Sequence, residues 1–392
     1  MKKKLLFVID SLGIGGAEKS LVTLLNQLDF SKYHIDLQMF GYGRSMEKFL
    51  PSNVNVLPPF RYTQFLSQPI WKQLSCPTML LGRLIYSFLI LKKNLLHSEK
   101  AVLYWKTIGR FIEKNPEKYD VAIAYAQGVP TFYTVDKVFA HKKLTWVNID
   151  YWLEGATRDY QRKYYELFDI IVNVSEYVRD VFCKVYPEFS DKMQVLRDLI
   201  NAQTIELMSR LPTEKNLNYN FPILMTVGRL EKNQKGYDLA LESAKILKLR
   251  NINFTWYAIG EGGYRKEMEK YIKDNGLEDY FILIGSTANP YAYMSQCNIY
   301  VQPSRHEGFG LTIAEALILN KPVVCTNFEG CTMQIAHKKN GLITSFRPED
   351  IADAIELLLN DKNLYSSIQN YIGKIKTDNI QGIDKFYQLI EK

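Results

Sequence analysis

Short apolar runs recur along this chain, and each is followed by a segment whose apolar residues have helical spacing. The first run is Leu5–Ile9, and after a glycine-rich loop the leucines of residues 21–28 recur at helical intervals. Similar runs follow at residues 34–40, 121–125, 144–147, 170–174, 223–227, 254–259, 281–284, 299–302 and 323–326. Because unbroken apolar strands alternating with helices are typical of parallel sheets covered on both faces, the sequence predicts an α/β fold.

The length of the chain and a lapse in this pattern predict two domains. A chain of 392 residues is too long for one ordinary core, and the alternation lapses into a polar stretch between Leu199 and Phe221. We predict an amino-terminal Rossmann-like domain over residues 1–200, a connection over 201–221 and a carboxy-terminal doubly wound domain over 222–392. The pattern does not assign the final helices, so packing of the last helix on the first domain remains open.

The composition is that of a globular protein, and it excludes several classes of protein. The chain is 47% apolar and 23% charged, and its five scattered cysteines form no CxxC pair, which disfavours a disulfide framework or a thiolate metal site and fits a reducing compartment. The longest apolar segment, residues 76–91, contains Arg83 and is shorter than the roughly 20 residues of a spanning helix. Asp10 interrupts the apolar start, so we expect a buried first strand and no export signal.

The net charge of +7 is concentrated in residues 51–119, which hold ten Lys or Arg against three Glu. This segment is also rich in aromatic residues, among them Trp71, Phe88 and Trp105. Two interpretations remain open: the segment docks on the headgroups of an anionic membrane, or it is a solvated basic face over a core. Nucleic acid is disfavoured as a partner because no known binding motif accompanies the charge.

A glycine-rich loop at residues 13–16 follows the first strand and opens a helix. Backbone N–H groups at such a position can bind a phosphate, although a purely structural turn would have the same sequence. The spacing is not that of a dinucleotide fingerprint, because Glu18 stands three places after Gly15, and no acidic residue closes the second strand near Phe40. An NAD-binding site is therefore disfavoured.

Two further clusters follow predicted strands in the second half of the chain. In residues 227–236, Arg229 offers a planar fork and Lys235 a point charge, a pair suited to a diphosphate, although an exposed basic loop is the alternative. In residues 303–316, Glu307 and Glu315 lie eight positions apart around a glycine loop that precedes a helix. Loop N–H groups there can face a phosphate while Glu315 accepts hydrogen bonds from a ribose diol.

Taken together, these three clusters resemble those of the retaining glycosyltransferases of family 4, the group 1 glycosyltransferases, and in particular bacterial capsular and exopolysaccharide enzymes. The resemblance implies a GT-B fold, in which two Rossmann-like domains face each other across a cleft. It implies that Arg229 and Lys235 bind the nucleotide diphosphate, Glu315 the ribose, and Glu307 the hydroxyls of the transferred sugar. It also implies donor contacts by Gly15, Gly16, Gly228, Phe309, Gly310, Leu311 and Thr312, and nucleobase contacts by Gly285 and Ser286.

One position departs from the family pattern. Many members carry a histidine near the catalytic site where residues 146–150 of this chain have Asn148. Asparagine cannot take up a proton, which puts an acid–base role there in doubt and leaves Asp150 as a candidate on the acceptor side. The family resemblance implies a same-face substitution in which the departing diphosphate oxygen itself takes the acceptor proton.

The sequence thus predicts a cytoplasmic, metal-independent hexosyltransferase without a cofactor, peripheral on the inner face of the cell membrane. Its donor would be a nucleotide-diphosphate sugar, with UDP as the first choice of base and GDP as the alternative. Its acceptor would be a saccharide or lipid-linked saccharide of a bacterial surface polysaccharide. The alternatives are a GT-B epimerase or phosphorylase, and a nucleotide-sugar-binding partner subunit that is inactive alone.

Overall fold

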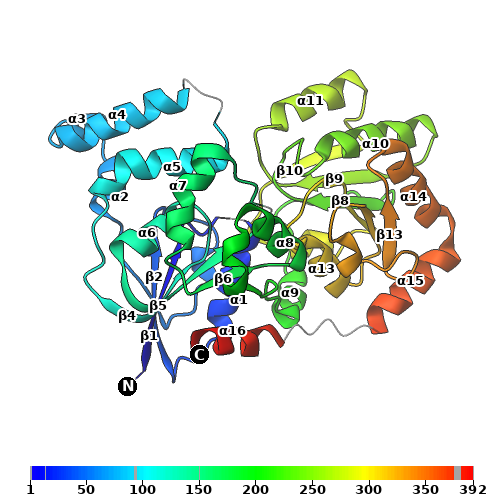
Figure 1. The fold of residues 1–392 in the computed structure, drawn as a ribbon. Helices are drawn as coiled ribbons and strands as arrows, with labels where there is room; N and C mark the ends of the chain where they lie inside the picture. The colour runs from blue at the N-terminus through cyan, green and yellow to red at the C-terminus, as the bar shows by residue number, and fades with distance from the viewer. Residues whose placement is uncertain (1, 14, 92–94, 150, 375–380, 392) are drawn as a thin grey trace. The chain divides into compact units, whose positions relative to one another are not determined.

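Two sheets, each made of parallel strands, contain the long apolar runs of the sequence (Figure 1). The structure is a computed structural model that describes residues 2–13, 15–91, 95–149, 151–374 and 381–391. The chain divides into unit 1, which comprises Met1–Leu199 and Ile380–Lys392, and unit 2, which comprises Ile200–Asn379.

The sheet of unit 1 has the strand order β3-β2-β1-β4-β5-β6-β7, with every described pair parallel. Its strands are β1 (Lys3–Ile9), β2 (Tyr33–Met39), β3 (Val54–Val56), β4 (Lys118–Ala124), β5 (Phe139–Val147), β6 (Ile170–Asn173) and β7 (Met193–Val195). The helices of this unit are α1 (Gly16–Gln27), α2 (Arg61–Ser67), α3 (Ile70–Gln73), α4 (Pro77–Leu91), α5 (His97–Ile108), α6 (Val129–Lys137), α7 (Gly155–Tyr165), α8 (Glu176–Val185) and α16 (Gln381–Glu391), with short 3-10 turns η1 (Glu47–Phe49), η2 (Gly109–Phe111) and η3 (Pro187–Lys192).

The first strand explains why its sequence is apolar without interruption. Leu5, Phe7 and Ile9 of β1 lie in a core cluster on one face of the sheet, and Leu6 and Val8 lie in a second cluster on the other face. Since successive side chains of a strand point to opposite faces, a strand covered on both sides has no position for a polar side chain. The predicted doubly wound arrangement is therefore present in unit 1.

The sheet of unit 2 has the order β10-β9-β8-β11-β12-β13, and its described pairs are also parallel. Its strands are β8 (Ile223–Val227), β9 (Thr255–Ile259), β10 (Phe281–Gly285), β11 (Ile299–Gln302), β12 (Val323–Thr326) and β13 (Gly341–Thr344). The helices are α9 (Ala202–Ser209), α10 (Tyr237–Leu249), α11 (Arg265–Asp274), α12 (Tyr291–Met294), α13 (Leu311–Ile318), α14 (Pro348–Asn360) and α15 (Lys362–Lys374), with the turn η4 (Cys331–Met333). The strand order changes direction between β8 and β11, which is where ligands bind in folds of this kind.

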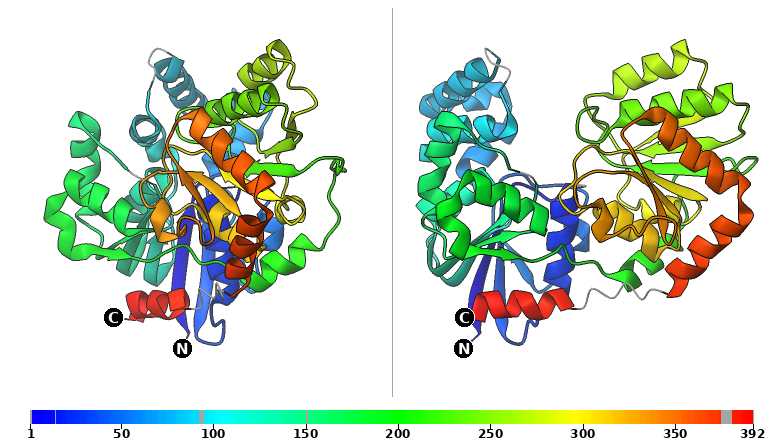
Figure 2. Two further views of the ribbon diagram at one scale, coloured as in Figure 1. Left: turned by 90° about the vertical axis from the view of Figure 1, so that its right-hand side faces the viewer. Right: turned by 45° about the vertical axis from the view of Figure 1, so that its right-hand side comes forward.

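The two units differ from the predicted domain limits at residues 201–221, and they place the last helix on unit 1, which the sequence had left open. Residues 201–221 are part of unit 2 and contain α9, which packs on α12 and α13 and buries Ile205, so this segment is not only a connection. Residues 381–391 form α16, which belongs to unit 1 and not to the carboxy-terminal domain. Figure 2 shows α16 beside the strands of unit 1, with both chain ends on the same side of that unit.

Aromatic side chains hold α16 to the sheet of unit 1. Phe386 is fully buried, with its ring centroid 6.1 Å from that of Phe7 and 6.2 Å from that of Trp146. The hydroxyl of Tyr33 donates a hydrogen bond to Glu391 Oε1 at 2.7 Å, and its ring stacks on that of Tyr387. The carboxy-terminal helix therefore completes one face of the unit 1 core.

The change Phe386→Ala is expected to destabilise unit 1 by about 3 to 5 kcal/mol, because it leaves a cavity among fully buried aromatic rings. The measurement is denaturant unfolding followed by tryptophan fluorescence, which is dominated by unit 1 because four of the five tryptophans lie there: Trp71, Trp105, Trp146 and Trp152. Phe346→Ala is the matched control, since Phe346 is 43% exposed on unit 2. Equal midpoints for Phe386→Ala and the wild type would contradict this role of α16.

Most aromatic residues of the basic segment 51–119 lie in the core. Phe60, Tyr62, Phe65 and Trp105 are buried in the cluster on one face of the unit 1 sheet. These four rings therefore belong to the core beneath the basic segment, whereas Trp71 and Phe88 of the same segment are exposed. None of the described helices is both long and apolar enough to cross a membrane.

Candidate functional site

The predicted donor residues of unit 2 cluster on two loops that leave neighbouring strands. One loop, residues 228–236, connects β8 to α10, and the other, residues 303–310, connects β11 to α13. Because β8 and β11 are adjacent and parallel, both loops leave the same edge of the sheet. The sequence order thus brings Lys235 and Glu307 to one place although 71 residues separate them.

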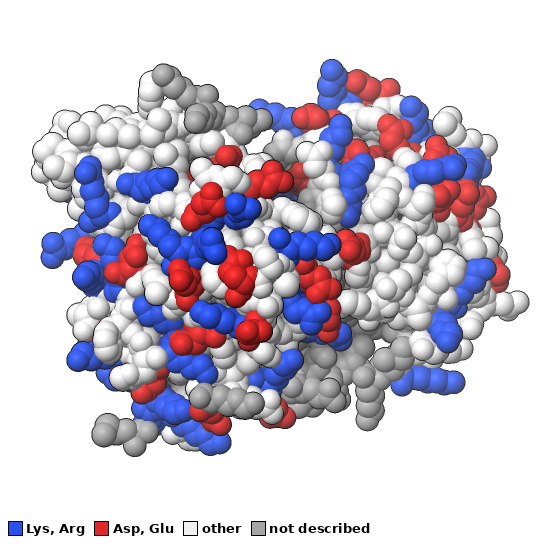
Figure 3. Space-filling model, viewed as in Figure 1, with Lys and Arg blue, Asp and Glu red and all other residues white. Residues whose placement is uncertain are grey.

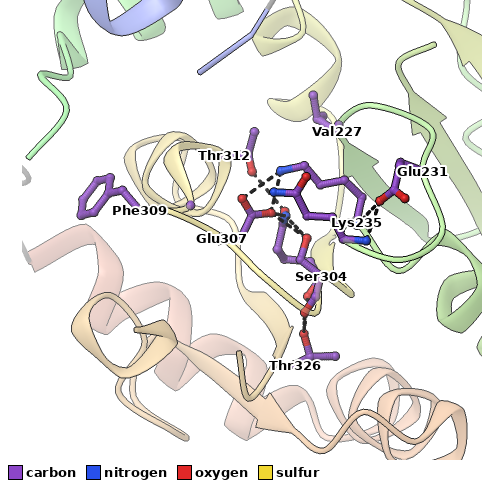
Figure 4. Close-up of polar contacts among 12 residues, drawn as sticks. Val227, Glu231, Lys235, Ser304, Glu307, Phe309, Thr312 and Thr326 are labelled. Carbon is purple, nitrogen blue, oxygen red and sulfur yellow. Dashed lines mark hydrogen bonds and ion pairs between the residues drawn. The ribbon is translucent and has the colours of Figure 1, made fainter. Parts of the chain in front are cut away.

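Lys235 and Glu307 form the central ion pair of this site. Lys235 Nζ lies 2.8 Å from both Oε1 and Oε2 of Glu307, and the side chains are only 20% and 8% exposed (Figure 4). Gln302 Nε2 and Ser304 Oγ also donate to Glu307 Oε1, at 2.7 and 2.6 Å. A buried carboxylate is costly unless it is paired and hydrogen-bonded, and these contacts meet that requirement at Oε1.

Gln302 is held so that its amide N–H faces Glu307. Its carbonyl Oε1 accepts from Tyr300 OH at 2.7 Å and from Thr312 Oγ1 at 3.0 Å. These two donors fix the amide orientation, and Nε2 then also reaches Ser304 Oγ at 2.8 Å. Gln302, at the end of β11, therefore links the first turn of α13 to the carboxylate of Glu307 on the loop between these two elements.

The loop after β8 is shaped by Glu231 and Gly236. The carboxylate of Glu231 accepts from the backbone N–H groups of Asn233, Gln234 and Lys235. Gly236 has φ 65° and ψ 30°, and a Cβ there would lie 2.0 Å from the carbonyl oxygen of Pro303. Only glycine allows this close approach, which brings the two loops together beside Lys235.

Arg305 ties the loop after β11 to the start of α10. Its guanidinium makes a two-pronged contact with Asp238, at 2.8 and 2.7 Å, and donates to the carbonyl of Lys232 at 2.8 Å. This geometry uses the planar fork of arginine, which lysine lacks. The side chain of Arg305 therefore has a structural partner on each neighbouring segment.

Arg229 occupies a different environment from Lys235. It is exposed on the loop after β8 and makes no ion pair with any residue that the structure describes. The two cations predicted to bind the diphosphate thus differ: Arg229 is exposed, whereas Lys235 is mostly buried and pairs with Glu307. The predicted role of each stays a prediction.

Glu315 lies one turn into α13 and is 3% exposed. Its Oε1 accepts a hydrogen bond from the hydroxyl of Tyr291 at 2.8 Å, and burial together with this carboxylate raises the pKa of Tyr291 well above its usual value. The helix begins after Gly310, which has φ 78°, and Gln334 Nε2 donates to the carbonyls of Phe309 and Gly310. Figure 4 shows the ring of Phe309 pointing away from the Lys235–Glu307 pair.

The predicted nucleobase segment follows β10. Gly285 is the last residue of that strand, with φ 93°, and its carbonyl accepts from the N–H of Gly260 at 2.9 Å. Ser286 is exposed. Both residues lie at the carboxyl edge of the sheet, as predicted. Their contact with a nucleobase stays a prediction.

In unit 1, a carboxylate already lies against the glycine loop. Gly15 caps α1, and a Cβ on it would lie 2.2 Å from Glu18 Oε2. Glu18 is in the first turn of the helix, where negative charge is favoured by the helix dipole. A phosphate at Gly15 and Gly16 would therefore meet the carboxylate of Glu18 at the same helix end.

Asn148 follows β5, and a hydrogen bond to unit 1 backbone orients it. Its Nδ2 donates to the carbonyl of Tyr125 at 2.9 Å, while its Oδ1 is buried and meets no donor among the described residues. The amide oxygen therefore has capacity for a further donor, although solvent does not reach it in this structure. The other candidate of this segment, Asp150, lies outside the described residues.

The amino-acid sequence of unit 2 identifies its family. Residues 209–374 match the protein family described as "Glycosyl transferases group 1". Unit 2 is a group 1 glycosyltransferase domain. The similarity to curated relatives is partial in length: the matched segments cover 38% of an alpha-D-kanosaminyltransferase from Streptomyces kanamyceticus, 31% identical over 36% of this chain. A poly(ribitol-phosphate) alpha-N-acetylglucosaminyltransferase from Staphylococcus aureus is 27% identical over 49% of this chain and 43% of its own length.

Solved structures extend the likeness to the whole chain at the level of the fold. Anabaena Alr3699/HepE in complex with UDP and glucose has a TM-score of 0.71, with 17% identity and full coverage of both chains. TarM of S. aureus, in a complex that contains UDP, has a TM-score of 0.66 with 15% identity and full coverage of both chains. The group 1 domain is therefore part of a chain with the predicted GT-B fold.

Several residues of the group 1 domain's site were not predicted from the sequence. Gln302 and Ser304 flank the end of an otherwise apolar strand, and polar side chains at a strand's carboxyl end are a usable signal. Asp238 and Tyr291 gave no such signal, because their roles depend on contacts with Arg305 and Glu315, distant in sequence. Among the described residues, no three His, Cys, Asp or Glu side chains gather as a metal site.

The change Arg305→Ala is expected to destabilise unit 2 by about 1 to 3 kcal/mol, because the carboxylate of Asp238 loses a charge-assisted pair that is partly buried. Arg305→Lys should recover less than half of the loss, since an ammonium cannot fill both prongs. Denaturant unfolding followed by circular dichroism measures the effect. Arg347→Ala serves as the control, because the side chain of Arg347 is 70% exposed. If Arg347→Ala lowers the free energy of unfolding as much as Arg305→Ala does, the structural role assigned to Arg305 is refuted.

Proposed function

We propose that this protein is a glycosyltransferase that moves a sugar from a nucleotide-diphosphate sugar, with UDP as the nucleotide, to a saccharide or lipid-linked saccharide. The observation that carries the proposal is the buried Lys235–Glu307 pair, which lies at the carboxyl edge of the sheet inside a group 1 glycosyltransferase domain. A cation and a carboxylate at one point match a ligand that carries both phosphate and sugar hydroxyls.

The contacts of Glu307 suggest which atom would meet the sugar. Its Oε1 accepts from Lys235, Gln302 and Ser304, whereas the described donor to Oε2 is Lys235. A carboxylate oxygen can accept more than one hydrogen bond, so Oε2 has capacity for a sugar hydroxyl. We therefore assign Glu307 Oε2 to the transferred sugar, Glu315 to the ribose, and Arg229 with Lys235 to the diphosphate.

We further propose that transfer retains the anomeric configuration. The bond between the anomeric carbon and the diphosphate oxygen breaks, the acceptor oxygen bonds to the same face of that carbon, and the departing oxygen takes the acceptor proton. Charge that develops on the diphosphate would be met by Arg229, Lys235 and the N–H groups at the start of α13, without a metal ion. Asn148 Oδ1 would accept a hydrogen bond from a sugar hydroxyl, since an amide cannot act as the base.

The relatives support a saccharide acceptor. One is named for transfer to poly(ribitol-phosphate), one for capsular polysaccharide biosynthesis, and one for transfer to a diphospho-undecaprenol-linked sugar. We propose an acceptor of the same broad class, a surface polysaccharide or its lipid-linked precursor, used on the cytoplasmic face of the membrane. The partner-subunit alternative predicts that the purified chain alone transfers no sugar, so product analysis with donor and acceptor decides between them.

Thermal unfolding with UDP, GDP, CMP, NAD and a panel of nucleotide sugars tests the donor site. A nucleotide at about 100 times its Kd should stabilise unit 2 by roughly 2.7 kcal/mol, and Glu315→Ala should abolish this shift for one nucleotide class. Tyr291→Phe is the control, because it removes the hydrogen bond to Glu315 but keeps the carboxylate. A response to NAD that survives Glu315→Ala, or no response to any nucleotide, would refute the proposal.

A further inference from the structure

Unit 1 exposes large apolar side chains on α3, on α4 and at Leu74, which follows α3 directly. We call this set the α3–α4 apolar face, and its members are 40% to 84% exposed: Ile70, Trp71, Leu74, Leu81, Leu84, Ile85, Phe88 and Leu91. Single exposed apolar residues are ordinary, but an exposed apolar patch of adjacent residues marks a surface that binds something.

The spacing of these residues puts them on one side of α4. Leu81, Leu84, Ile85 and Phe88 follow one another at intervals of three, one and three residues, which is one stripe of a helix. The other side of α4 is anchored in unit 1, where Gly82 is buried and leaves no room for a Cβ beside the ring of Phe111. The fold of the described unit 1 thus uses one side of α4 and leaves the apolar stripe uncovered.

The segment that carries this face has charges of a single sign. From Lys48 to Ser98 the sequence contains no Asp or Glu, whereas its cations include Lys72 and Arg83. The ammonium of Lys72 lies 5.1 Å from the centre of the Trp71 ring. Figure 3 shows the surface over α3 and α4 without the acidic side chains that are scattered over the rest of the same view. The complementary partner is therefore negatively charged.

The composition of the face favours lipid over protein as this partner. Of its eight side chains, only the indole of Trp71 can form a hydrogen bond. Protein–protein interfaces carry about one hydrogen bond per 100 to 200 Å², which this surface cannot supply from its side chains. Aliphatic residues with a tryptophan and adjacent cations are typical of helices that lie in the headgroup region of a bilayer.

We propose that the α3–α4 apolar face inserts into the interfacial region of a bilayer that contains anionic lipid. The α4 helix has 15 residues and is about 22 Å long, shorter than the roughly 30 Å hydrocarbon core, so it lies along the surface and does not span it. The aliphatic stripe enters the acyl boundary while Lys72 meets the lipid phosphates. This proposal goes beyond the transfer reaction and does not depend on it.

Vesicle flotation tests the docking surface with the full chain. The wild type should co-float with vesicles that contain phosphatidylglycerol and at least tenfold less with pure phosphatidylcholine. Leu84→Gln with Phe88→Gln should reduce co-flotation at least tenfold. Leu207→Gln with Leu249→Gln is the matched control, since those leucines are 65% and 72% exposed on unit 2. Equal flotation of the two double variants, or of the wild type with both lipids, would overturn the proposal.

Two further readouts separate this result from other causes. Brominated lipid should quench a fluorescence component that Trp71→Phe removes, and the absence of such a component would also refute insertion. Sedimentation tests whether the face binds a second copy of the chain. If the wild type does not bind vesicles and forms a dimer that Leu84→Gln/Phe88→Gln does not form, the face is a protein interface and the proposal is refuted. The nucleotide-induced thermal shift should be the same in this variant and the wild type, so a failure here is distinct from a failure of the proposed function.

Discussion

Replacing Lys235 by methionine is expected to destabilise unit 2 by about 3 kcal/mol and to abolish its response to nucleotide sugars. Glu307 is 7% exposed, and without Lys235 the described donors to its carboxylate are the neutral groups of Gln302 and Ser304. Removing one partner of a buried ion pair costs more than the pair contributes, because the remaining charge is left in a poorly solvated place. Denaturant unfolding followed by circular dichroism, with and without UDP, measures both effects.

The double variant Lys235→Met/Glu307→Gln separates stability from donor binding. It removes the unpaired charge, so most of the lost stability should return, while the response to UDP stays absent because the cation is still missing. The control is Lys232→Met, in which an exposed lysine of the same loop is changed and stability should move by less than about 0.5 kcal/mol. A double variant as unstable as Lys235→Met would contradict the view that the stranded carboxylate causes the loss.

Replacing Gly236 by alanine is expected to cost at least about 3 kcal/mol. The residue has φ 65°, which an L side chain rarely adopts, and its Cβ would lie 2.0 Å from the carbonyl oxygen of Pro303. The obstacle is a backbone carbonyl, which cannot rotate away as a flexible side chain can. The loops after β8 and β11 would therefore have to move apart to admit the Cβ. Because Lys235 is the preceding residue, the same change should also weaken the response to UDP.

The control for this substitution is Gly263→Ala, since a Cβ at Gly263 would meet nothing within 4 Å and its φ is not in the left-handed region. We expect its free energy of unfolding to stay within about 0.5 kcal/mol of the wild type. Guanidinium unfolding of both variants gives the comparison. If Gly236→Ala unfolds at the wild-type midpoint, the contact between the two loops does not constrain this glycine.

The sequence predicted the long central strands and missed short strands at the sheet edges. Strands such as β1 and β8 are buried on both faces, and this burial leaves an apolar run that can be recognised without a structure. The unpredicted strands β3, β7 and β13 each lie at an edge and have only three or four residues. An edge strand has one neighbour and tolerates polar residues, such as Asn55 in β3, so its pattern is weak.

The sequence located the loops of the candidate site but not how they are held. Lys235 and Glu307 were predicted from their positions after strands, and the structure places them in contact at that edge of the sheet. The link from Arg305 to Asp238 spans 67 residues, and no local pattern reveals such a contact. The roles of the site residues toward a donor remain predictions, because they depend on a ligand that the described contacts do not include.

The chain passes from unit 1 to unit 2 and back again, and this has a consequence for how the protein folds during synthesis. Unit 2 is one continuous segment, complete once residue 379 has been made, whereas the unit 1 core still lacks Phe386 at that point. Domains fold as units as the chain emerges from the ribosome, with the amino-terminal one first as a rule. In this protein we expect unit 2 to finish folding first, because the unit 1 sheet is synthesised first but its core is completed only when α16 has been made.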